Sequence, residues 1–192
     1  MSWIKTIPYE EADQNLKKIY DRINGPNKKI DNVLQIHSLR PHSLTGHMTL
    51  YKSVLHNSNN TLPKWYLECI GVYVSHLNKC SYCIEHHYAG LKRLLNDDEK
   101  ATTIFEAIKK DSFEGVLEKK YLTGLDYSKM LTKNPDLITE ADVIILKDLG
   151  FSEGEVLEIN QVAAYFNYAN RTVLGLGVNT AGDVLGLSPN NS

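Results

Sequence analysis

Residues 68–87 read ECIGVYVSHLNKCSYCIEHH, and this stretch contains the strongest signals in the chain for both structure and chemistry. Apolar residues recur at helical spacing up to Leu77, and Pro63 upstream suits a first helical turn, where a proline loses no needed hydrogen bond. Asn78-Lys79 is typical of a helix end, and the helical spacing resumes at Ser81 and continues to about Leu95. The stretch therefore predicts two helices joined by a short break next to a cysteine pair.

Helix signals continue on both sides of this stretch, whereas strand patterns are scarce. Two capping-box spacings, starting at Thr139 and Ser152, predict two helices separated by Gly150. In the second of them one apolar face is expected in the core, namely Val156, Ile159, Ala163 and Phe166. The other expected helices are 8–23, opened by Pro8 and closed by Gly25-Pro26, then 43–56, 96–108 and 113–130. The sequence thus predicts an all-α protein.

Length and composition favour one globular unit. The chain has 192 residues, 42% of them hydrophobic, which is enough to bury a core. We expect a single domain over residues 1–192, composed of N-terminal helices (1–60), the helices of the cysteine motif (61–96) and C-terminal helices (97–192). A formal net charge of −2 disfavours binding to nucleic acid. Neither a membrane span of roughly 20 apolar residues nor a secretory signal is found, so a cytoplasmic protein is expected.

The cysteine pair is the main candidate for chemistry. Three cysteines are too few for a disulfide framework, and a close pair in a reducing compartment is typically redox-active or metal-binding. On a helix, Cys80, Cys83 and His87 fall within a sector of roughly 60°. The positive helix end favours a thiolate near Cys80, and His87 can serve as a base for Cys83. A thiolate attacks peroxide oxygen, and a second thiol converts the sulfenic acid to a disulfide.

Glu68 completes a longer pattern. It stands twelve residues before Cys80 on the preceding helix, where an inward carboxylate can orient His87 or accept its proton. Glu68, Cys80, Cys83 and His87 match E-x11-C-x2-C-x3-H, and on these residues the chain resembles the alkylhydroperoxidase D (AhpD) branch of the carboxymuconolactone decarboxylase superfamily. The segments around the cysteine pair and around Tyr165 look like its subgroup of peroxidase-related enzymes.

The resemblance implies an all-helical AhpD-like fold, assembly as a homo-oligomer, and reduction of hydrogen peroxide or an organic hydroperoxide. The reaction would pass through a Cys80–Cys83 disulfide with a proton relay through His87 and Glu68. In the family the second cysteine attacks, which would make Cys83 peroxidatic and Cys80 resolving, although helix position alone also permits the reverse. The implied reductant is a lipoyl-bearing or thioredoxin-type dithiol. No cofactor is expected, because the sequence lacks a nucleotide-binding glycine fingerprint.

Several residues near the motif have two interpretations. Tyr82 is a candidate pocket residue and stands where better-studied members of the family have a histidine. A phenol with a pKa near 10 is a poor base at neutral pH, although its hydroxyl can donate a hydrogen bond. His76 is a candidate pocket residue, or it caps the C-terminus of its helix. His86 points about 100° away from His87 and is expected at the surface or an interface. Cys69 lies beside apolar residues and is expected to be a buried, inert thiol.

Farther along the chain, Tyr165, Asn167 and Arg171 are interface or pocket candidates, with packing and helix ending as an equal alternative. Zinc is disfavoured because no second pair of ligands has motif spacing, although His76, His86 and His87 could supplement the cysteines. A c-type haem is excluded because Ile84 follows Cys83. Two other functions compete with the peroxidase: a redox sensor without catalysis, and a decarboxylase or isomerase acting on a small lactone.

Overall fold

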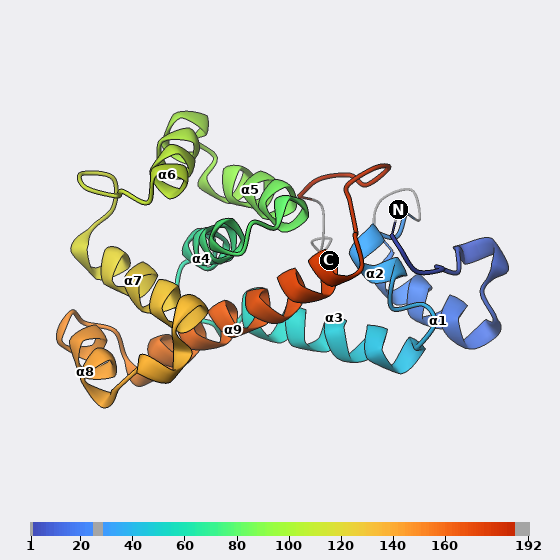
Figure 1. Ribbon diagram of the computed structural model, residues 1–192, viewed down its shortest axis with the longest axis horizontal. Helices are drawn as coiled ribbons and strands as arrows, with labels where there is room; N and C mark the ends of the chain where they lie inside the picture. Colours follow the sequence, from blue (N-terminus) through green and yellow to red (C-terminus); the bar gives the residue numbers. More distant parts are fainter. Residues whose placement is uncertain (1, 25–28, 187–192) are drawn as a thin grey trace.

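The computed structural model describes residues 2–24 and 29–186, and the regular structure of these residues is entirely helical (Figure 1). The helices are, in chain order, α1 (Gln14–Ile23), α2 (Asn32–Gln35), α3 (Pro41–Leu55), α4 (Lys64–Leu77), α5 (Ser81–Leu95), α6 (Asp98–Lys110), α7 (Lys119–Lys133), α8 (Glu140–Asp148) and α9 (Glu153–Gly175). Short 3-10 turns occur at Tyr9–Glu11 and Pro135–Leu137. The prediction of an all-α protein is confirmed.

Helix α4 is the centre of the molecule. Every residue from Tyr66 to Ser75 is buried, and α4 packs against α5, α7 and α9, which surround it in Figure 1. Helix α9 comes close because Gly71 has no side chain: a Cβ there would lie 2.3 Å from the Phe166 ring. A helix buried on all sides is normally apolar, yet α4 contains Glu68, whose carboxylate must find partners inside the protein.

The break between α4 and α5 is a tight helix end that sets the position of the cysteines. Lys79 adopts a left-handed conformation with φ 59°, and the backbone N–H groups of Lys79 and Cys80 donate to the carbonyls of His76 and Ser75, both at 2.9 Å. This pairing is a Schellman motif, which closes α4 and leaves no further linker. Cys80 is consequently the N-cap residue of α5. The predicted break at Asn78-Lys79 is confirmed.

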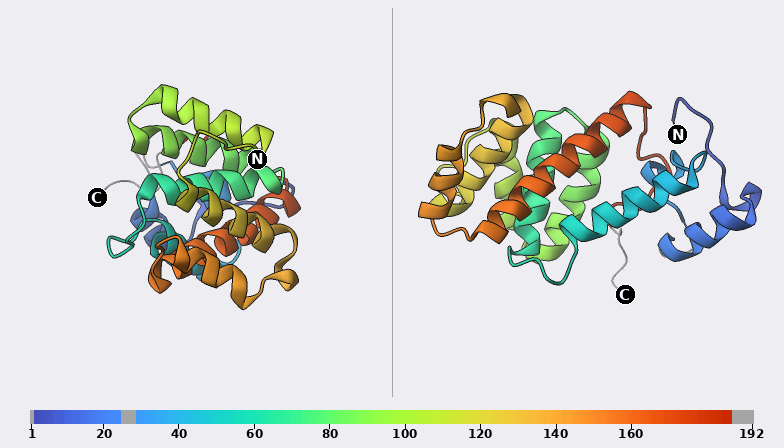
Figure 2. Two further views of the ribbon diagram at one scale, coloured as in Figure 1. Left: turned by 90° about the vertical axis from the view of Figure 1, so that its left-hand side faces the viewer. Right: turned by 90° about the horizontal axis from the view of Figure 1, so that it is seen from below.

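The helices form one body around a continuous core. Figures 1 and 2 show α3 beside α9, with α1 and α2 at one end of the molecule and α7 and α8 at the other. A large apolar cluster extends from Leu16 in α1 to Ala169 in α9, as expected for a single domain. Among the described residues, no helix is long and apolar enough to cross a membrane.

The segment after α9, Val178–Gly186, lies across the ends of α2 and α5, and we call it the strap (Figure 1). Thr180 Oγ1 donates to Glu85 of α5 at 2.8 Å, and the Asp183 carboxylate accepts from the backbone N–H of Asn32 in α2 at 3.1 Å. Arg93 of α5 also donates to the carbonyl of Gly186. The strap therefore connects two helices that are far apart in the sequence.

Both predicted capping boxes are present, at Thr139 for α8 and at Ser152 for α9. Gly150, between the two helices, has φ 88°, in the left-handed region that glycine tolerates. The apolar face expected for α9 is buried, and it consists of Val156, Ile159, Ala163 and Phe166.

Two predicted helices start later than expected. Ala12 is extended and Asp13 caps α1 by accepting from the N–H of Leu16 at 2.8 Å, so Pro8 precedes only a 3-10 turn. The Gly25-Pro26 pair expected to close α1 lies outside the described residues. Residues 113–118 form turns before α7, because Gly115 has φ 72° and interrupts the helical backbone. Helix α2 had no clear signal in the sequence.

Candidate active site

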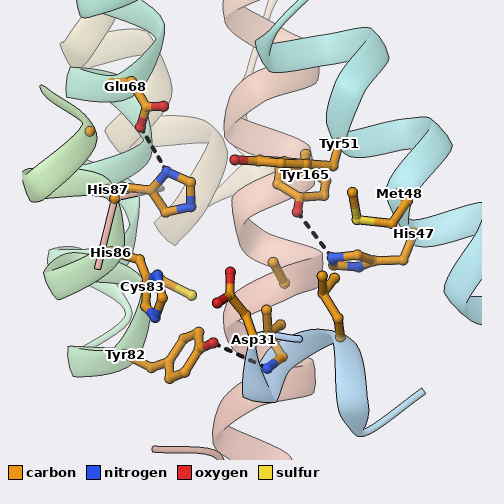
Figure 3. A pocket seen from close by; sticks show the side chains of 15 residues that line it. Asp31, His47, Met48, Tyr51, Glu68, Tyr82, Cys83, His86, His87 and Tyr165 are labelled. Atoms are coloured by element: carbon orange, nitrogen blue, oxygen red, sulfur yellow. Dashed lines mark hydrogen bonds and ion pairs between the residues drawn. The ribbon is translucent and has the colours of Figure 1, made fainter. Parts of the chain in front are cut away.

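A pocket of about 50 Å³ lies between two walls of side chains (Figure 3). The motif wall comes from α4 and α5, and its residues are Glu68, Tyr82, Cys83, His86, His87 and Gly90. The facing wall comes from α3 and α9, and its residues are His47, Met48, Tyr51, Tyr165 and Ala169. Residues of α2, its preceding turn and the strap complete the lining, namely Asp31, Val33, Leu34 and Gly186.

The two cysteines of the motif have different access to this pocket. Cys83 lines it and is 4% exposed, whereas Cys80 is fully buried behind it against Ile36, Val173 and Val178. Both are free thiols. Of the two sulfur atoms, the one that can meet a molecule in the pocket is that of Cys83.

The sulfur pair shares a hydrogen bond at the N-terminus of α5. The thiol of Cys83 and its backbone N–H both hydrogen-bond to Cys80 and hold the pKa of Cys80 below its usual range, against the opposing effect of burial. The same thiol bond, together with burial, raises the pKa of Cys83. These two directions favour the thiolate on Cys80. Proton transfer from Cys83 to Cys80 would move the thiolate to Cys83, on the pocket side.

Asn170 of α9 anchors the pair from behind. Its side chain hydrogen-bonds to both cysteines, which helps to lower the pKa of Cys80 and opposes the rise in the pKa of Cys83, and its amide donates to Ser75 Oγ at 3.0 Å. It also accepts from Asn78 at 3.0 Å and is fully buried. An uncharged amide at this position stabilises a buried thiolate without a metal or a cation.

Glu68 and His87 meet across α4 and α5. The His87 Nδ1 atom lies 2.7 Å from Glu68 Oε2, and the carboxylate is 3% exposed. An ionised carboxylate can only accept, so Nδ1 carries the proton and Nε2 is left to exchange a proton with another group. Gly90 permits this approach, because a Cβ there would lie 3.3 Å from the carboxylate. The edge of the His87 ring contacts Phe166, at 4.5 Å between ring centroids.

The facing wall is aromatic and uncharged. The His47 Nε2 atom lies 3.4 Å from the Tyr165 hydroxyl, and Tyr51 packs beside Tyr165 with 5.7 Å between ring centroids. Burial, with a contribution from His37, lowers the pKa of His47 to about 4, so its imidazole is neutral at pH 7. Its Nδ1 atom is buried and has no hydrogen-bond partner among the described residues.

A third histidine lies at the outer end of the Glu68 carboxylate. His56 Nε2 is 3.8 Å from Glu68 Oε1. Burial lowers the pKa of His56 to about 4 despite the nearby carboxylate, so this imidazole is also neutral at pH 7. The Glu68 carboxylate therefore has one close partner, His87, and one distant neutral neighbour.

Comparisons with known proteins agree on the fold. The sequence matches no protein-family model and no curated protein. A solved structure from Ralstonia eutropha JMP134, described as an alkylhydroperoxidase AhpD core and an uncharacterized peroxidase-related protein, is 19% identical and has a TM-score of 0.78, covering 93% of this chain and 92% of that chain. An uncharacterized peroxidase-related protein from Silicibacter sp. TM1040 is 24% identical, with a TM-score of 0.77 over 93% and 91% of the two chains. This chain has the AhpD-like fold.

The AhpD-like fold supports more than one chemistry. The debrominase Bmp8 is 16% identical to this chain, with a TM-score of 0.70 and coverage of 86% of each chain. A shared fold with different activities means that the reaction has to be argued from the site.

For two histidines of this AhpD-like chain, one expected position is wrong: the pocket for His76 and the surface for His86. His76 does not line the pocket and lies in the last turn of α4, which is the position of its other interpretation, at the C-terminus of its helix. His86 is not at the surface but is 8% exposed and lines the pocket, stacked on Tyr82 at 4.6 Å between ring centroids. His86 is expected at the surface because it lies about 100° around α5 from His87, but the strap covers that face of the helix.

Tyr82 lines the pocket, and its hydroxyl has a structural partner. It donates to Asp183 Oδ2 of the strap at 2.6 Å and accepts from the backbone N–H of Val33 at 3.1 Å. Burial and Asp183 raise the pKa of Tyr82, so it does not act as a base at neutral pH. His86 Nε2 lies 3.3 Å from the same Asp183 carboxylate. Through Asp183, the strap thus holds the side chains of Tyr82 and His86 in the motif wall.

Of the remaining candidates from the sequence, one lines the pocket and three lie outside it. Cys69 is fully buried, which confirms its expected position, and burial raises the pKa of its thiol to about 12. Tyr165 is a pocket residue. Asn167 and Arg171 do not line the pocket, and they bond within the helices: Arg171 donates to the Asn167 side chain at 2.7 Å and Asn167 donates to Thr132 at 3.0 Å.

Several residues of the site were missed by the sequence analysis, and three of them are His47, Asn170 and Asp183. Each lies more than thirty residues from the cysteine motif along the chain, and none belongs to a spacing pattern. The only available signal was that His47 and Asn170 are polar residues inside apolar helical faces. Across residues 2–24 and 29–186, no cluster of three or more His, Cys, Asp or Glu side chains is arranged to hold a metal ion.

Proposed function

We propose that this chain is a thiol-dependent peroxidase-like oxidoreductase of the AhpD-like type. The observation that supports this function best is that Cys83 and His87 line one pocket on α5, with His87 paired to a buried carboxylate at 2.7 Å. The peroxidase-related descriptions of the two solved structures with this fold add support.

In the proposed cycle Cys83 attacks and Cys80 resolves. The Cys83 thiolate attacks one peroxide oxygen, the O–O bond breaks, and Cys83 becomes a sulfenic acid while an alkoxide or hydroxide leaves. The Cys80 sulfur then attacks the Cys83 sulfur and expels its oxygen as water, forming the Cys80–Cys83 disulfide. Two electrons pass from the two thiols to the peroxide. Pocket access supports this order, because Cys83 lines the pocket and Cys80 lies behind it.

His87 is the proposed proton carrier. With Nδ1 bound to Glu68, the Nε2 atom accepts a proton from the thiol side, directly or through water, and returns it to the leaving oxygen. Glu68 is a positioning residue, because it selects the tautomer of His87 and compensates the positive charge of the imidazolium.

A dithiol closes the cycle. A lipoyl-bearing or thioredoxin-type protein would reduce the Cys80–Cys83 disulfide by thiol–disulfide exchange, and its own dithiol would become a disulfide. We place the reaction in the cytoplasm, where such donors keep thiols reduced, and in a homo-oligomer, as the family resemblance implies.

The main alternative is a redox sensor, in which the same disulfide forms without repeated turnover. Catalysis and sensing differ in turnover: with dithiothreitol supplied, an enzyme consumes many equivalents of peroxide, whereas a sensor consumes one equivalent and then stays oxidised.

The test measures dithiothreitol-dependent consumption of hydrogen peroxide by the parent and by three single variants. Cys83→Ser and Cys80→Ser each remove one sulfur of the disulfide, so both are expected to abolish its formation and catalytic turnover. Cys69→Ser is the matched control, because that thiol lies outside the pocket, and its turnover is expected to equal that of the parent. Equal turnover in the parent and in both motif variants would exclude the mechanism.

A further inference from the structure

We propose that the substrate is a small, uncharged hydroperoxide, hydrogen peroxide foremost, held between Cys83 and the imidazole of His47. This inference rests on the proposed function and names the substrate class of the same site. The cysteine chemistry alone would accept small, large and charged peroxides equally, whereas this inference predicts that the pocket selects the small, uncharged ones.

The size of the pocket is the first argument. A cavity needs roughly 10 to 15 Å³ by this measure to hold one water-sized molecule, so about 50 Å³ holds only a few. Hydrogen peroxide has two oxygen atoms and fits such a space. Pockets for drug-sized ligands are several times larger, about 300 to 1,000 Å³, so a hydroperoxide with a phenyl ring exceeds the space beside Cys83.

The walls of this pocket are firmly packed. Tyr51 and Tyr165 contact each other, and Tyr165 is edge-on to Phe166 at 5.4 Å between ring centroids. Met48 is 5% exposed on the facing wall, and Gly186 of the strap lines the pocket where it packs against Ala89 and Gly90 of α5. Enlarging the cavity requires displacing buried aromatic rings or the strap, which a close-packed interior resists.

The charges around the pocket are the second argument. The lining residues include two carboxylates, Asp31 and Glu68, and no lysine or arginine. His47 is neutral at pH 7, because burial lowers its pKa to about 4. An anionic substrate, such as a fatty-acid hydroperoxide, would lose its hydration without meeting a cation. An uncharged peroxide avoids this cost.

His47 supplies the polar contact opposite the sulfur. Its ring borders the pocket across from Cys83 in Figure 3, its Nε2 is held only by the long 3.4 Å contact with Tyr165, and its Nδ1 has no partner among the described residues. A neutral imidazole can donate from one nitrogen and accept at the other, and each O–H group of hydrogen peroxide can do both. The unused hydrogen-bonding capacity of His47 therefore suits a small molecule of this kind.

The experiment compares kcat/KM for hydrogen peroxide and cumene hydroperoxide, with dithiothreitol as the reductant, in the parent and in two variants. In the parent, hydrogen peroxide is expected to be preferred by roughly 100-fold after correction for the intrinsic reactivity of the two peroxides with free thiolate. Met48→Ala removes bulk from the facing wall and is expected to reduce this preference about tenfold or more. Leu125→Ala, a similar truncation of a buried residue on α7 away from the pocket, is expected to leave the preference unchanged.

The outcomes separate this inference from the proposed function. Equal kcat/KM for both peroxides in the parent would overturn the inference and leave the peroxidase intact. Absence of thiol-dependent consumption of either peroxide would overturn the peroxidase itself. A preference that Met48→Ala and Leu125→Ala change equally would show that the pocket is not its source. If Met48→Ala does not fold, Met48→Val, which removes less volume, takes its place.

A second arm tests the role of His47. His47→Gln is expected to raise the KM for hydrogen peroxide about tenfold with little change in kcat, because the substrate loses a hydrogen bond while the cysteines and His87 remain. His42→Gln, an exposed position on the same helix, is the control. An unchanged KM in His47→Gln would remove His47 from the proposal.

Discussion

The two walls of the pocket satisfy their polar groups in opposite ways. On the motif wall, His87 is bound to Glu68 at 2.7 Å, and the two cysteines are bound to each other and to Asn170. On the facing wall, the closest polar partner of His47 is the Tyr165 hydroxyl at 3.4 Å, and the Nδ1 atom of His47 has no partner in the part of the chain that the structure describes.

This difference suggests a division of roles. Groups that are already paired are oriented before substrate arrives and can transfer protons without rearranging, which favours the chemical step. A buried polar atom without a partner in the protein is available to a ligand, which favours binding. Changes on the motif wall should therefore alter kcat, whereas changes on the facing wall should alter KM.

The largest expected effect comes from removing the proton carrier. His87→Ala should lower kcat by roughly 100- to 10,000-fold, the usual contribution of general acid–base catalysis, with a small change in KM. Glu68→Gln should act in the same direction and less strongly, because an amide still contacts Nδ1 but no longer compensates an imidazolium. Steady-state kinetics at pH 7 measures both, with His42→Ala as the control. A change in KM alone would contradict the division of roles.

A second prediction uses the neutral imidazoles around the pocket. The pKa values of His47 and His56 are lowered by burial to about 4, below the ordinary 6.5, so the unfolded chain binds more protons between these pH values. Their contribution to stability is present above pH 6.5 and is lost as the pH falls through 4, up to about 3 kcal/mol for each imidazole.

Urea unfolding between pH 7 and pH 4 measures this loss. His47→Gln and His56→Gln should each flatten the dependence of the free energy of unfolding on pH, because glutamine binds no proton. His42→Gln, at an exposed position on α3, should follow the parent. Parallel curves for all four proteins would show that the buried imidazoles are not neutral in the folded state.

The smallest expected effect concerns the strap. Asp183→Asn weakens the bonds from Tyr82 and Asn32 and the contact with His86, so it should cost about 1 to 3 kcal/mol of local stability. Faster amide hydrogen exchange across Val178–Gly186 would report the release of the strap. Glu85→Gln weakens only the exposed bond from Thr180 and should change exchange much less. Equal exchange in both variants would mean that Asp183 does not hold the strap.

Much of the fold was predictable because helix signals are local. The capping boxes at Thr139 and Ser152, the break at Asn78-Lys79 and the helical spacing from Ser81 to Leu95 each depend on residues within a few positions of one another. Short-range hydrogen bonds and side-chain spacing determine such features regardless of what packs nearby. The predicted start of a helix at residue 113 failed because Gly115 adopts a left-handed backbone conformation. Glycine permits this conformation, but its presence in a sequence does not show that the conformation is adopted.

The sequence by itself also determined the position of the candidate dithiol, since Cys80, Cys83 and His87 lie within two turns of one helix. Only the tertiary structure decided what faces them. Packing of α3 and α9 beside α5 brought His47 and Tyr165 to the pocket, and the strap brought Asp183 to Tyr82 and His86. Helix periodicity sets which side of a helix is apolar, but it does not specify which distant segment covers that side. The candidate reacting group is thus determined by residues close together in the sequence, whereas the size and polarity of its pocket are determined by the packing of distant segments.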